Sequence, residues 1–288
     1  MARDLIAVTG ATGQLGGRVA RLLAAAGIAQ RLVVRDPSRA PELAGAEVAV
    51  ASYGEPAALR SALQGVGTLL LVSATENADR VALQTRAVDA AVEAGVPRIV
   101  YTSFLAAAPD ATFTFARDHW HTEQHIRGTG VDFTFLRDSI YLDYVPLFAG
   151  ADGVIRGPAG DGRVAGVARD DVADVTTAVL LGEGHGGRTY DLTGPASFTL
   201  DEAAEELSRA AGRPVHYHAE TIEEAYASRA GYGAPEFEVA GWVSTYTAIG
   251  TGELDVVSDA VATVAGHPPQ SLAEFLDANP ATVDHLRP

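Results

Sequence analysis

The stretch that decides the fold is Thr9-Gly10-Ala11-Thr12-Gly13-Gln14-Leu15-Gly16-Gly17, which follows the apolar run Leu5–Val8 and opens a segment with helical spacing of apolar residues. Its glycines have the spacing G-x-x-G-x-x-G, a variant of the dinucleotide-binding fingerprint between a strand and a helix. Glycine permits a tight turn and lets a pyrophosphate approach the backbone, and the start of the helix attracts the anion. The alternative is a tight turn without a ligand, but the strand–turn–helix context favours a cofactor site. The residues expected to contact the cofactor are Gly10, Thr12, Gly13, Gln14, Leu15 and Gly16.

Up to about residue 137, short apolar runs alternate with helix-like segments. Most runs are continuously apolar, as in a parallel sheet covered on both faces. This alternation predicts an α/β fold with a Rossmann-like doubly wound parallel sheet. The expected strands are Leu5–Thr9, Arg31–Arg35, Glu47–Val50, Thr68–Ser73, Arg98–Ser103 and Asp132–Arg137, and the expected helices include Gly16–Ala26 and Ala78–Glu93.

The end of the second expected strand indicates which dinucleotide is bound. An acidic residue at this position would accept hydrogen bonds from a ribose 2′-hydroxyl, whereas an arginine suits a 2′-phosphate. Arg35 comes first and Asp36 follows, so the sequence favours NADP(H) over NAD(H), and Arg39 could add positive charge. The alternative for Arg35 is a solvated surface charge. Ser73 ends the fourth expected strand, where loop residues of such sheets flank the cofactor, although it could also simply terminate the strand.

After Tyr141 the pattern loosens, and we expect a small C-terminal α+β substrate lobe. Residues 1–140 are expected to form the NADP(H)-binding Rossmann domain, and residues 141–288 mainly the substrate lobe, with segments that return to the sheet. One helix has readable ends, because Thr199 and Glu202 have the spacing of a capping box and Gly212 stops the segment. The other expected elements are helices at Arg169–Leu181, Glu220–Ala230, Pro235–Ile249 and Ser271–Asp277, and strands at Arg188–Thr193 and Pro214–Ala219.

Two absences from the composition limit the chemistry. The 288 residues include no cysteine, and all 21 basic residues are arginine. This excludes thiol catalysis, thiolate metal sites, a P-loop, a Schiff base and a Tyr-x-x-x-Lys dyad. The net charge of −16 argues against nucleic acid and anionic membranes as partners. Short apolar runs and a start without a secretory signal pattern predict a cytoplasmic protein without membrane spans, and homo-oligomerisation stays open.

Several motifs together resemble the NmrA-like atypical short-chain dehydrogenases, and within them most closely the NADPH-dependent quinone oxidoreductase branch of type 2. The resemblance covers nearly the whole chain. Its motifs are specific for the fold and for NADP(H), and less so for the substrate. The motifs that carry it are Val8–Gly17, Arg35-Asp36-Pro37-Ser38, Tyr101-Thr102-Ser103, His119…Glu123…Gly130–Arg137, Arg169–Ala173, Tyr190–Pro195 and Gly266–Leu272.

The resemblance implies an altered active site. Ordinary short-chain dehydrogenases use a Ser, a Tyr and a Lys four residues after the Tyr, commonly followed by a Glu four residues further on. With Glu123 as that glutamate, His119 takes the lysine position, Phe115 takes the tyrosine position, and Ser103 is the serine. We therefore expect His119 to contact the nicotinamide ribose or donate a proton, with Ser103 and Tyr141 as the other catalytic candidates, although a structural role for His119 is nearly as well supported.

Two further clusters have ordinary explanations. His119, His121 and His125 lie within seven residues, but the glutamate between them has the wrong offset for a zinc helix, so we expect no metal. An aromatic pocket for a flat substrate is a hypothesis for the group as a whole, whereas each member alone is better explained by core packing. That group is Phe104, Tyr141, Tyr144, Trp242 and Tyr246.

Three functions compete at this point. The first is an NADPH-dependent oxidoreductase that transfers hydride to a quinone or a similar flat, aromatic small molecule. The second is an NADP(H)-binding redox sensor of the NmrA type, which binds a partner protein and performs no catalysis. A sugar-nucleotide epimerase is disfavoured because it needs the missing Tyr and Lys. Loss of that dyad cannot separate the first two functions, but the similarity to the quinone branch favours catalysis.

Overall fold

The computed structural model describes residues 5–287, which form two compact units that interleave along the chain. The first unit contains residues 5–104, 118–137 and 170–190. The second contains residues 105–117, 138–169 and 191–287. Within residues 5–287 no helix is long and apolar enough to cross a membrane.

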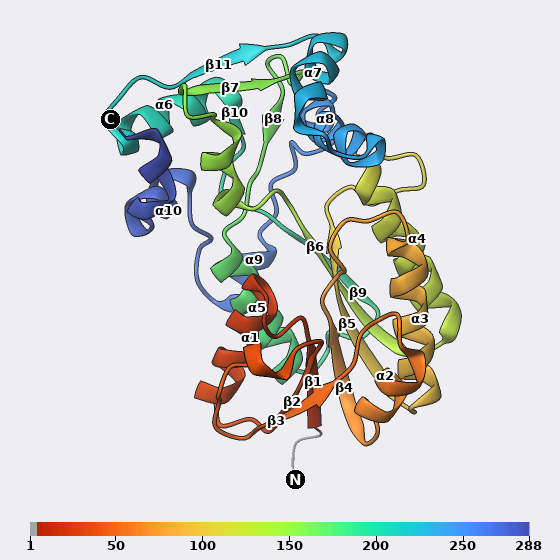
Figure 1. Ribbon diagram of the computed structural model, residues 1–288. Helices are drawn as coiled ribbons and strands as arrows, with labels where there is room; N and C mark the ends of the chain where they lie inside the picture. The colour runs from red at the N-terminus through yellow and green to blue at the C-terminus, as the bar shows by residue number, and fades with distance from the viewer. Residues whose placement is uncertain (1–4, 288) are drawn as a thin grey trace. The chain divides into compact units, whose positions relative to one another are not determined.

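The first unit is built on a seven-stranded sheet with the strand order β3-β2-β1-β4-β5-β6-β9 (Figure 1). The pairs from β3 across to β5 are parallel. The bounds are β1 Leu5–Thr9, β2 Gln30–Val34, β3 Ala46–Val50, β4 Val66–Leu71, β5 Arg98–Phe104, β6 Asp132–Asp138 and β9 Arg188–Leu192. The predicted doubly wound α/β sheet is confirmed. Its strand order changes direction between β1 and β4, which creates a switch point at the carboxyl ends of these two strands.

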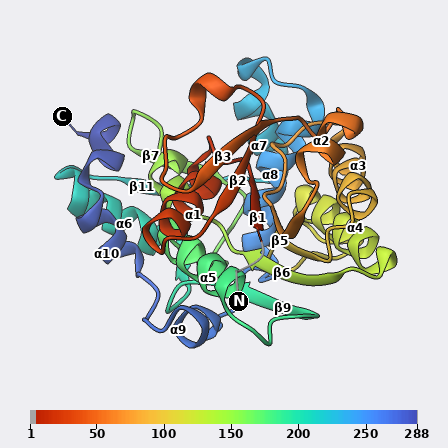
Figure 2. The same ribbon diagram turned by 90° about the horizontal axis from the view of Figure 1, so that it is seen from below.

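Helices cover both faces of this sheet. Figure 2 shows α1 and α5 on one face and α2, α3 and α4 on the other. Their bounds are α1 Gln14–Ala25, α2 Pro56–Ala62, α3 Arg80–Glu93, α4 Thr114–Thr129 and α5 Arg169–Leu181. The helix α1 presents Leu15, Val19 and Leu23 on one buried stripe, which explains its helical spacing of apolar residues. On the other face, Tyr101, Ile126 and Phe135 belong to the fully buried core.

Two predicted boundaries matter for the site. The strand β4 ends at Leu71, two residues before the predicted end, so Ser73 lies in the loop that follows the strand. The helix α1 begins at Gln14 rather than at Gly16, so Gly13 is its N-cap residue. Strand ends are hard to place from sequence, because apolar side chains continue past the last residue that pairs with the neighbouring strand.

The second unit combines short strands with helices. The strands β7 (Val154–Gly157) and β11 (His216–Ala219) pair in parallel, and β8 (Arg163–Val164) and β10 (Phe198–Thr199) pair antiparallel. The helices are α6 Leu200–Ala211, α7 Ile222–Arg229, α8 Glu236–Gly250, α9 Ala260–Ala265 and α10 Leu272–Ala278. The capping box at Thr199 and the end of α6 at Gly212 are confirmed.

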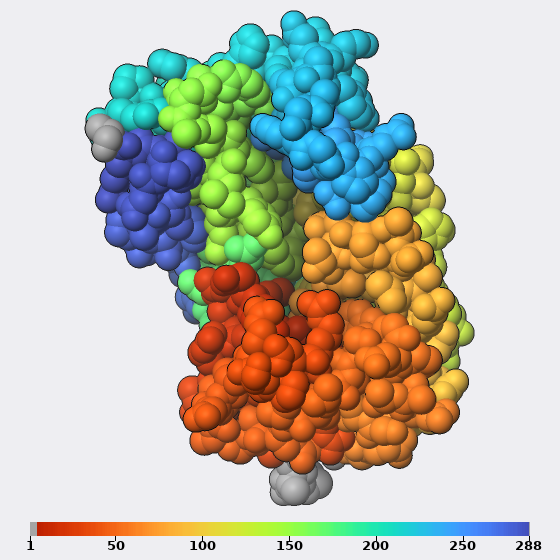
Figure 3. All heavy atoms as spheres, viewed as in Figure 1, coloured from red at the N-terminus to blue at the C-terminus, as the bar shows by residue number. Residues whose placement is uncertain are grey.

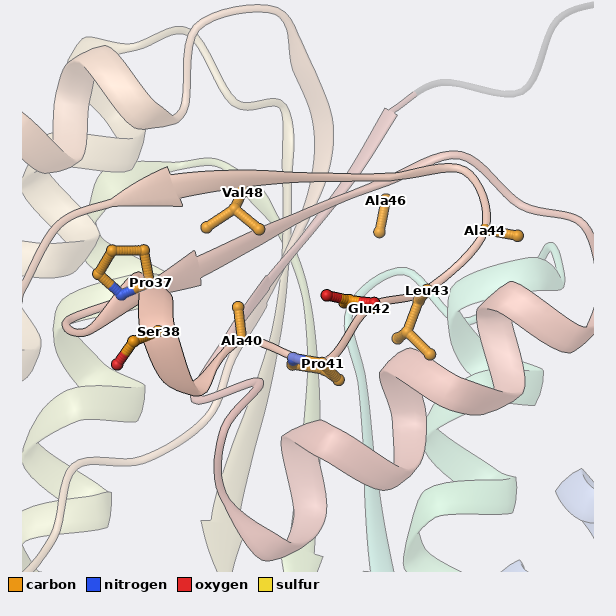
Figure 4. Close-up of a pocket in the computed structure, with 9 residues that line it drawn as sticks. All are labelled: Pro37, Ser38, Ala40, Pro41, Glu42, Leu43, Ala44, Ala46 and Val48. Carbon is orange, nitrogen blue, oxygen red and sulfur yellow. The ribbon is translucent and has the colours of Figure 1, made fainter.

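Four short 3-10 segments complete the part of the chain that the structure describes. They are η1 Pro37–Arg39, η2 Leu142–Phe148, η3 Ala230–Tyr232 and η4 Pro280–Leu286. The residues after β2 up to β3, red to orange in Figure 3, lie at the surface of the first unit. They surround a shallow depression of about 690 Å³ (Figure 4), lined mostly by small or apolar side chains such as Ala40, Pro41 and Leu43. Glu42 is the single charged residue in this lining, so the depression offers no countercharge to a phosphate.

Candidate functional site

The glycine-rich turn begins at the switch point of the sheet. The Thr9 hydroxyl at the end of β1 accepts a 2.9 Å hydrogen bond from the Val72 amide just beyond β4. The Tyr53 hydroxyl lies 2.6 Å from that of Thr9 and donates to the Val72 carbonyl over 2.6 Å. These contacts tie the ends of β1 and β4 together, and ligands of open α/β sheets bind beyond the carboxyl ends of strands at such a point.

The three glycines of the fingerprint are needed for three different reasons. Gly10 has a φ of 62°, a conformation that favours glycine because a side chain would strain it. A Cβ atom at Gly16 would lie 2.5 Å from the Gly10 carbonyl oxygen and 2.8 Å from that of Thr9, so this glycine allows the helix to pack against the strand. A Cβ atom at Gly13 would meet a single atom within 4 Å, the Gly10 carbonyl oxygen at 3.1 Å. Gly13 is exposed, so beyond this one tight contact its outer side is open to a ligand.

The start of α1 fits a pyrophosphate. Its N-cap, Gly13, makes no side-chain capping hydrogen bond, and the first turn contains no acidic residue. Backbone N–H groups at a helix start have no partner within the helix, and their partial positive charge attracts an anion. Gln14 is exposed, with its side-chain oxygen 2.9 Å from Arg18 Nη1. Leu15 is buried in the core, so it can offer a cofactor only its backbone.

Alanine at Gly13 and at Gly16 should separate binding from folding. Gly13→Ala is expected to weaken NADPH binding by about tenfold or more, because the new methyl group occupies the open space, while the midpoint of urea unfolding stays close to that of the wild type. Gly16→Ala is expected to destabilise the fold by about 2–3 kcal/mol, because its methyl group meets backbone atoms that cannot move away. Nucleotide titration and urea unfolding of both variants check this pair. Equal effects of the two substitutions on folding would contradict it.

The residues after β2 favour a 2′-phosphate. The Asp36 carboxylate accepts hydrogen bonds from the amide and the hydroxyl of Ser38, at 3.0 and 2.6 Å, and these bonds hold its pKa below the usual value. The guanidinium groups of Arg35 and Arg39 are exposed, and no hydrogen bond or ion pair within residues 5–287 engages them. The Asp36 carboxylate therefore caps η1, whereas the guanidinium groups of Arg35 and Arg39 remain available to bind an anion.

Reversing the charge at Arg35 should change the cofactor preference. Arg35→Glu is expected to weaken NADPH binding by about 100-fold, because a carboxylate repels the 2′-phosphate that the guanidinium would pair with. The affinity for NADH, which lacks this phosphate, should change little. Arg86→Glu makes the same charge change on the exposed side of α3 and is the matched control. Equal losses for NADPH and NADH would exclude the proposed role of Arg35.

The loop after β4 is held by buried polar side chains. The Ser73 amide donates to the Thr102 hydroxyl over 2.8 Å. The peptide groups on both sides of Ala74 are fixed, because the Ala74 amide donates to Gln84 Oε1 over 3.0 Å and the Ala74 carbonyl accepts from Arg80 Nε over 2.8 Å. Gln84 and Arg80 lie on the buried face of α3. Neither residue was predicted from the sequence, although polar residues on the inner face of a helix are a usable signal.

The structure gives His119 a different state from the expected proton donor. His119 Nε2 lies 2.9 Å from an Arg80 nitrogen, and because arginine only donates, this ring nitrogen must accept. His119 Nδ1 therefore carries the hydrogen and faces the Tyr101 hydroxyl at 2.9 Å. Burial, followed by the charges of Arg80 and Arg137, lowers the pKa of His119 well below 6.5. The imidazole is neutral at physiological pH, so it positions Arg80 and Phe104, whose ring stacks on it at 6.2 Å.

The predicted catalytic serine is committed to a buried carboxylate. The Ser103 hydroxyl donates to Glu123 Oε1 over 2.6 Å. Arg137 donates to both oxygens of Glu123, at 2.8 and 2.6 Å, and the Glu123 side chain is completely buried. Ser103 is therefore part of an internal network that joins β5, α4 and β6, and its catalytic role stays a prediction.

Tyr141 lies in the second unit, where its contacts point to a residue that the sequence analysis missed. Its hydroxyl donates to Asp138 Oδ2 over 2.5 Å, and burial raises the pKa of Asp138 to about 7. The Arg169 guanidinium lies 4.5 Å from the centre of the Tyr141 ring and 4.4 Å from that of Tyr144. Arg169 forms its ion pair with Asp143, at 2.9 Å. The sequence signal that could have identified Asp138 as a site residue was its position directly after an apolar predicted strand.

The expected aromatic group does not form one cluster within the second unit. Tyr141 contacts Tyr144, Tyr246 contacts Phe148 at 5.3 Å, and Trp242 contacts Tyr232 at 6.1 Å. The ring contacts therefore link η2 to α8 through Phe148 and Tyr246, and η3 to α8 through Tyr232 and Trp242. Phe104 belongs to the first unit.

The histidines of α4 form no metal site. His121 and His125 are on the outer side of α4, and His125 Nε2 lies 2.7 Å from Asp89 Oδ1. No group of three potential metal ligands occurs in residues 5–287.

Comparison with known proteins gives full-length matches. A model of the NmrA-like family matches residues 2–276. Quinone oxidoreductase 2 of Escherichia coli (strain K12) is 36% identical over 277 residues, covering 94% of this chain and 96% of that protein, and the NAD(P)H azoreductase of Xenophilus azovorans is 33% identical over 282 residues, covering 96% and 98%. The crystal structure of the NADPH-dependent quinone oxidoreductase from Escherichia coli, complexed with NADPH, has a TM-score of 0.86 at 34% identity, covering 95% of this chain and 99% of that one.

Proposed function

This chain belongs to the NmrA-like family, and we propose that it transfers hydride from NADPH to a quinone or a similar flat electrophile without a Tyr-Lys dyad. It is an NAD(P)H-dependent oxidoreductase, in line with its relatives at 33–36% identity. The activities for which these relatives are named, on quinones and on azo compounds, have a flat conjugated acceptor in common. The observation that carries the proposal is the glycine turn, in which open space at Gly13 meets an uncapped helix start at the switch point of the sheet.

The first unit supplies the residues proposed to hold NADP(H). When bound, this cofactor supplies the hydride. The backbone of the glycine turn would hold the pyrophosphate, Arg35 would hold the 2′-phosphate, and the fixed loop at Ser73 and Ala74 would flank the nicotinamide. The expected contact residues are Gly10, Thr12, Gly13, Gln14, Leu15, Gly16, Arg35 and Ser73. The second unit, with most of the 141–288 segment, would supply contacts to the acceptor, including Tyr141.

A quinone needs less acid catalysis than an unactivated carbonyl, because it is already an electrophile. This agrees with a sequence that has no lysine and has Phe115 where the resemblance places a tyrosine. The chain's main contribution would then be to orient the cofactor and the acceptor, which can supply a large part of the rate enhancement. Ser103 and His119 would act as positioning residues behind this arrangement.

The deciding experiment is NADPH consumption by the purified protein with a simple benzoquinone, without it, and without enzyme. We expect clear quinone-dependent turnover, and we expect Arg35→Glu to lose most of it with NADPH but not with NADH. Binding of NADPH is measured in the same sample. Intact binding without turnover on benzoquinone or an azo dye would reject the proposed reaction and favour a redox sensor.

A further inference from the structure

We propose that Asp138 and Tyr141 form a proton relay in which Asp138 supplies the proton that Tyr141 delivers to the reduced acceptor. The inference rests on the proposed function, since it names the groups that complete the reduction. Asp138 is the last residue of β6 and Tyr141 directly precedes η2, both within the second unit. The arrangement concerns this unit alone.

The Asp138 carboxyl forms no ion pair within residues 5–287. Its side chain is 3% exposed, and its oxygen Oδ2 takes the 2.5 Å hydrogen bond of the Tyr141 hydroxyl. Its other oxygen, Oδ1, is buried and has no hydrogen-bond partner in the part of the chain that the structure describes. The nearby Arg169 forms its ion pair with Asp143 and stacks on the Tyr141 ring instead. A buried carboxylate with neither a cation nor a full set of donors gains from binding a proton.

The titration of Asp138 agrees with this geometry. Burial raises its pKa to about 7, and the groups that oppose this shift are the Tyr141 hydroxyl and the positive charge of Arg169. Burial and the neighbouring Asp138 raise the pKa of Tyr141 well above 10, with Tyr144 adding to the increase and Arg169 opposing it. The phenol therefore does not lose a proton to water unaided near neutral pH. The carboxyl exchanges one readily in this range.

The short hydrogen bond can carry a proton from the Asp138 carboxyl to the Tyr141 oxygen. When Asp138 is ionised, the Tyr141 hydroxyl donates to it. When Asp138 is protonated, the carboxyl donates to the phenol oxygen, and the Tyr141 O–H is free to point toward an acceptor. Arg169, over the ring, stabilises negative charge on the phenol oxygen during the transfer.

The reaction balances with these two groups. Hydride transfer gives the quinone two electrons and one hydrogen, which leaves a hydroquinone monoanion. A new O–H bond then forms on its oxygen while the O–H bond of Tyr141 breaks, and the proton of Asp138 passes to the Tyr141 oxygen. Water returns a proton to Asp138 after product release, so one NADPH and one proton are consumed for each hydroquinone formed.

The alternative is a structural hydrogen bond that only fixes the start of η2. The two roles differ in their dependence on the acceptor. A relay matters for an electron-rich quinone, whose reduced anion is basic, and hardly for an electron-poor quinone, whose reduced anion is stable without a proton. A structural role would affect both acceptors equally.

The test compares Asp138→Asn, Tyr141→Phe and the double variant with Ser139→Ala, which removes a neighbouring buried hydroxyl that has no partner within residues 5–287. With a methylated quinone, wild-type kcat should fall above about pH 7 as Asp138 ionises. Asp138→Asn should lower kcat at pH 6 by about 100-fold and remove this decline. The loss of kcat with an electron-poor quinone should be about tenfold smaller than this, or less. The double variant should be no slower than either single variant, and Ser139→Ala should resemble the wild type.

A second readout needs neither cofactor nor acceptor. Carbon-13 NMR of protein labelled at the Asp carboxyl carbons should show one resonance that titrates near pH 7 and is missing in Asp138→Asn. The relay is overturned if no such resonance exists, or if wild type turns over and Asp138→Asn keeps its pH profile. If this resonance is present but the wild type shows no turnover with any acceptor, the proposed function is overturned instead.

Discussion

Replacing Glu123 by alanine is expected to destabilise the folded protein by about 3–5 kcal/mol. The Glu123 carboxylate is completely buried and accepts hydrogen bonds from Ser103 and, through both oxygens, from Arg137. Without it, the guanidinium of Arg137 loses its buried countercharge, and the Ser103 hydroxyl loses its acceptor. Urea unfolding monitored by circular dichroism measures the loss as a lower midpoint at an unchanged slope.

Two controls separate this buried network from an ordinary ion pair. Ser103→Ala removes one neutral donor and should cost about 1 kcal/mol. Glu93→Ala breaks the exposed pair between Glu93 and Arg60, whose side chains are 58% and 49% accessible, and should cost less than about 1 kcal/mol. Similar losses for Glu123→Ala and Glu93→Ala would show that the burial of the network contributes nothing.

Raising the pH from 4 to 8 is expected to destabilise the wild type relative to Asp138→Asn by about 4 kcal/mol. The pKa of Asp138 is raised from its usual 3.8 to about 7 in the fold. Between these values the folded state holds a proton that the unfolded state has released, so the free energy of unfolding falls as pH rises, by about 1.4 kcal/mol per pH unit. Below pH 4 the contribution is fully present, and above pH 7 it is lost.

The measurement is a series of urea unfolding curves at half-unit pH steps for both proteins. Asp138→Asn cannot titrate at this position, so the difference between the two curves cancels the contributions of other groups. A difference that stays constant from pH 4 to pH 8 would mean that the folded protein holds Asp138 at an ordinary pKa. This result would also remove the basis of the proton relay.

The sheet could be predicted from sequence because its strands are continuous apolar runs. All six expected N-terminal strands exist, and β1 has the predicted bounds. The predicted end of β4 was wrong by two residues, since Val72 is still apolar and β-prone after pairing has stopped. The capping box at Thr199 was found because its two partners are three residues apart, so the signal is entirely local.

The residues of the candidate site could likewise be predicted where their signal is local in the sequence, and could not where it depends on residues far away in the chain. The three glycines could be predicted because their spacing is short. Which of them has an open outer side depends on the fold and could not be predicted. The neutral state of His119 could not be predicted, because it depends on burial and on Arg80, which lies 39 residues away in the sequence. Asp138 was not predicted as a site residue, because its pKa is changed by burial in the fold and not by its neighbours in the sequence. The network around Glu123 likewise joins three elements that only the fold brings together.

The contact between Ser38 and Asp36 has a consequence for how this protein could evolve. If Arg35 holds the 2′-phosphate as proposed, Ser38 keeps the neighbouring carboxylate occupied and away from a ribose hydroxyl. Coenzyme choice then depends on a neutral residue as well as on the charged ones. A lineage that lost the Ser38 hydroxyl would leave the acid held by the Ser38 amide alone, and could move towards the other cellular pool of reducing equivalents before either charged residue had changed.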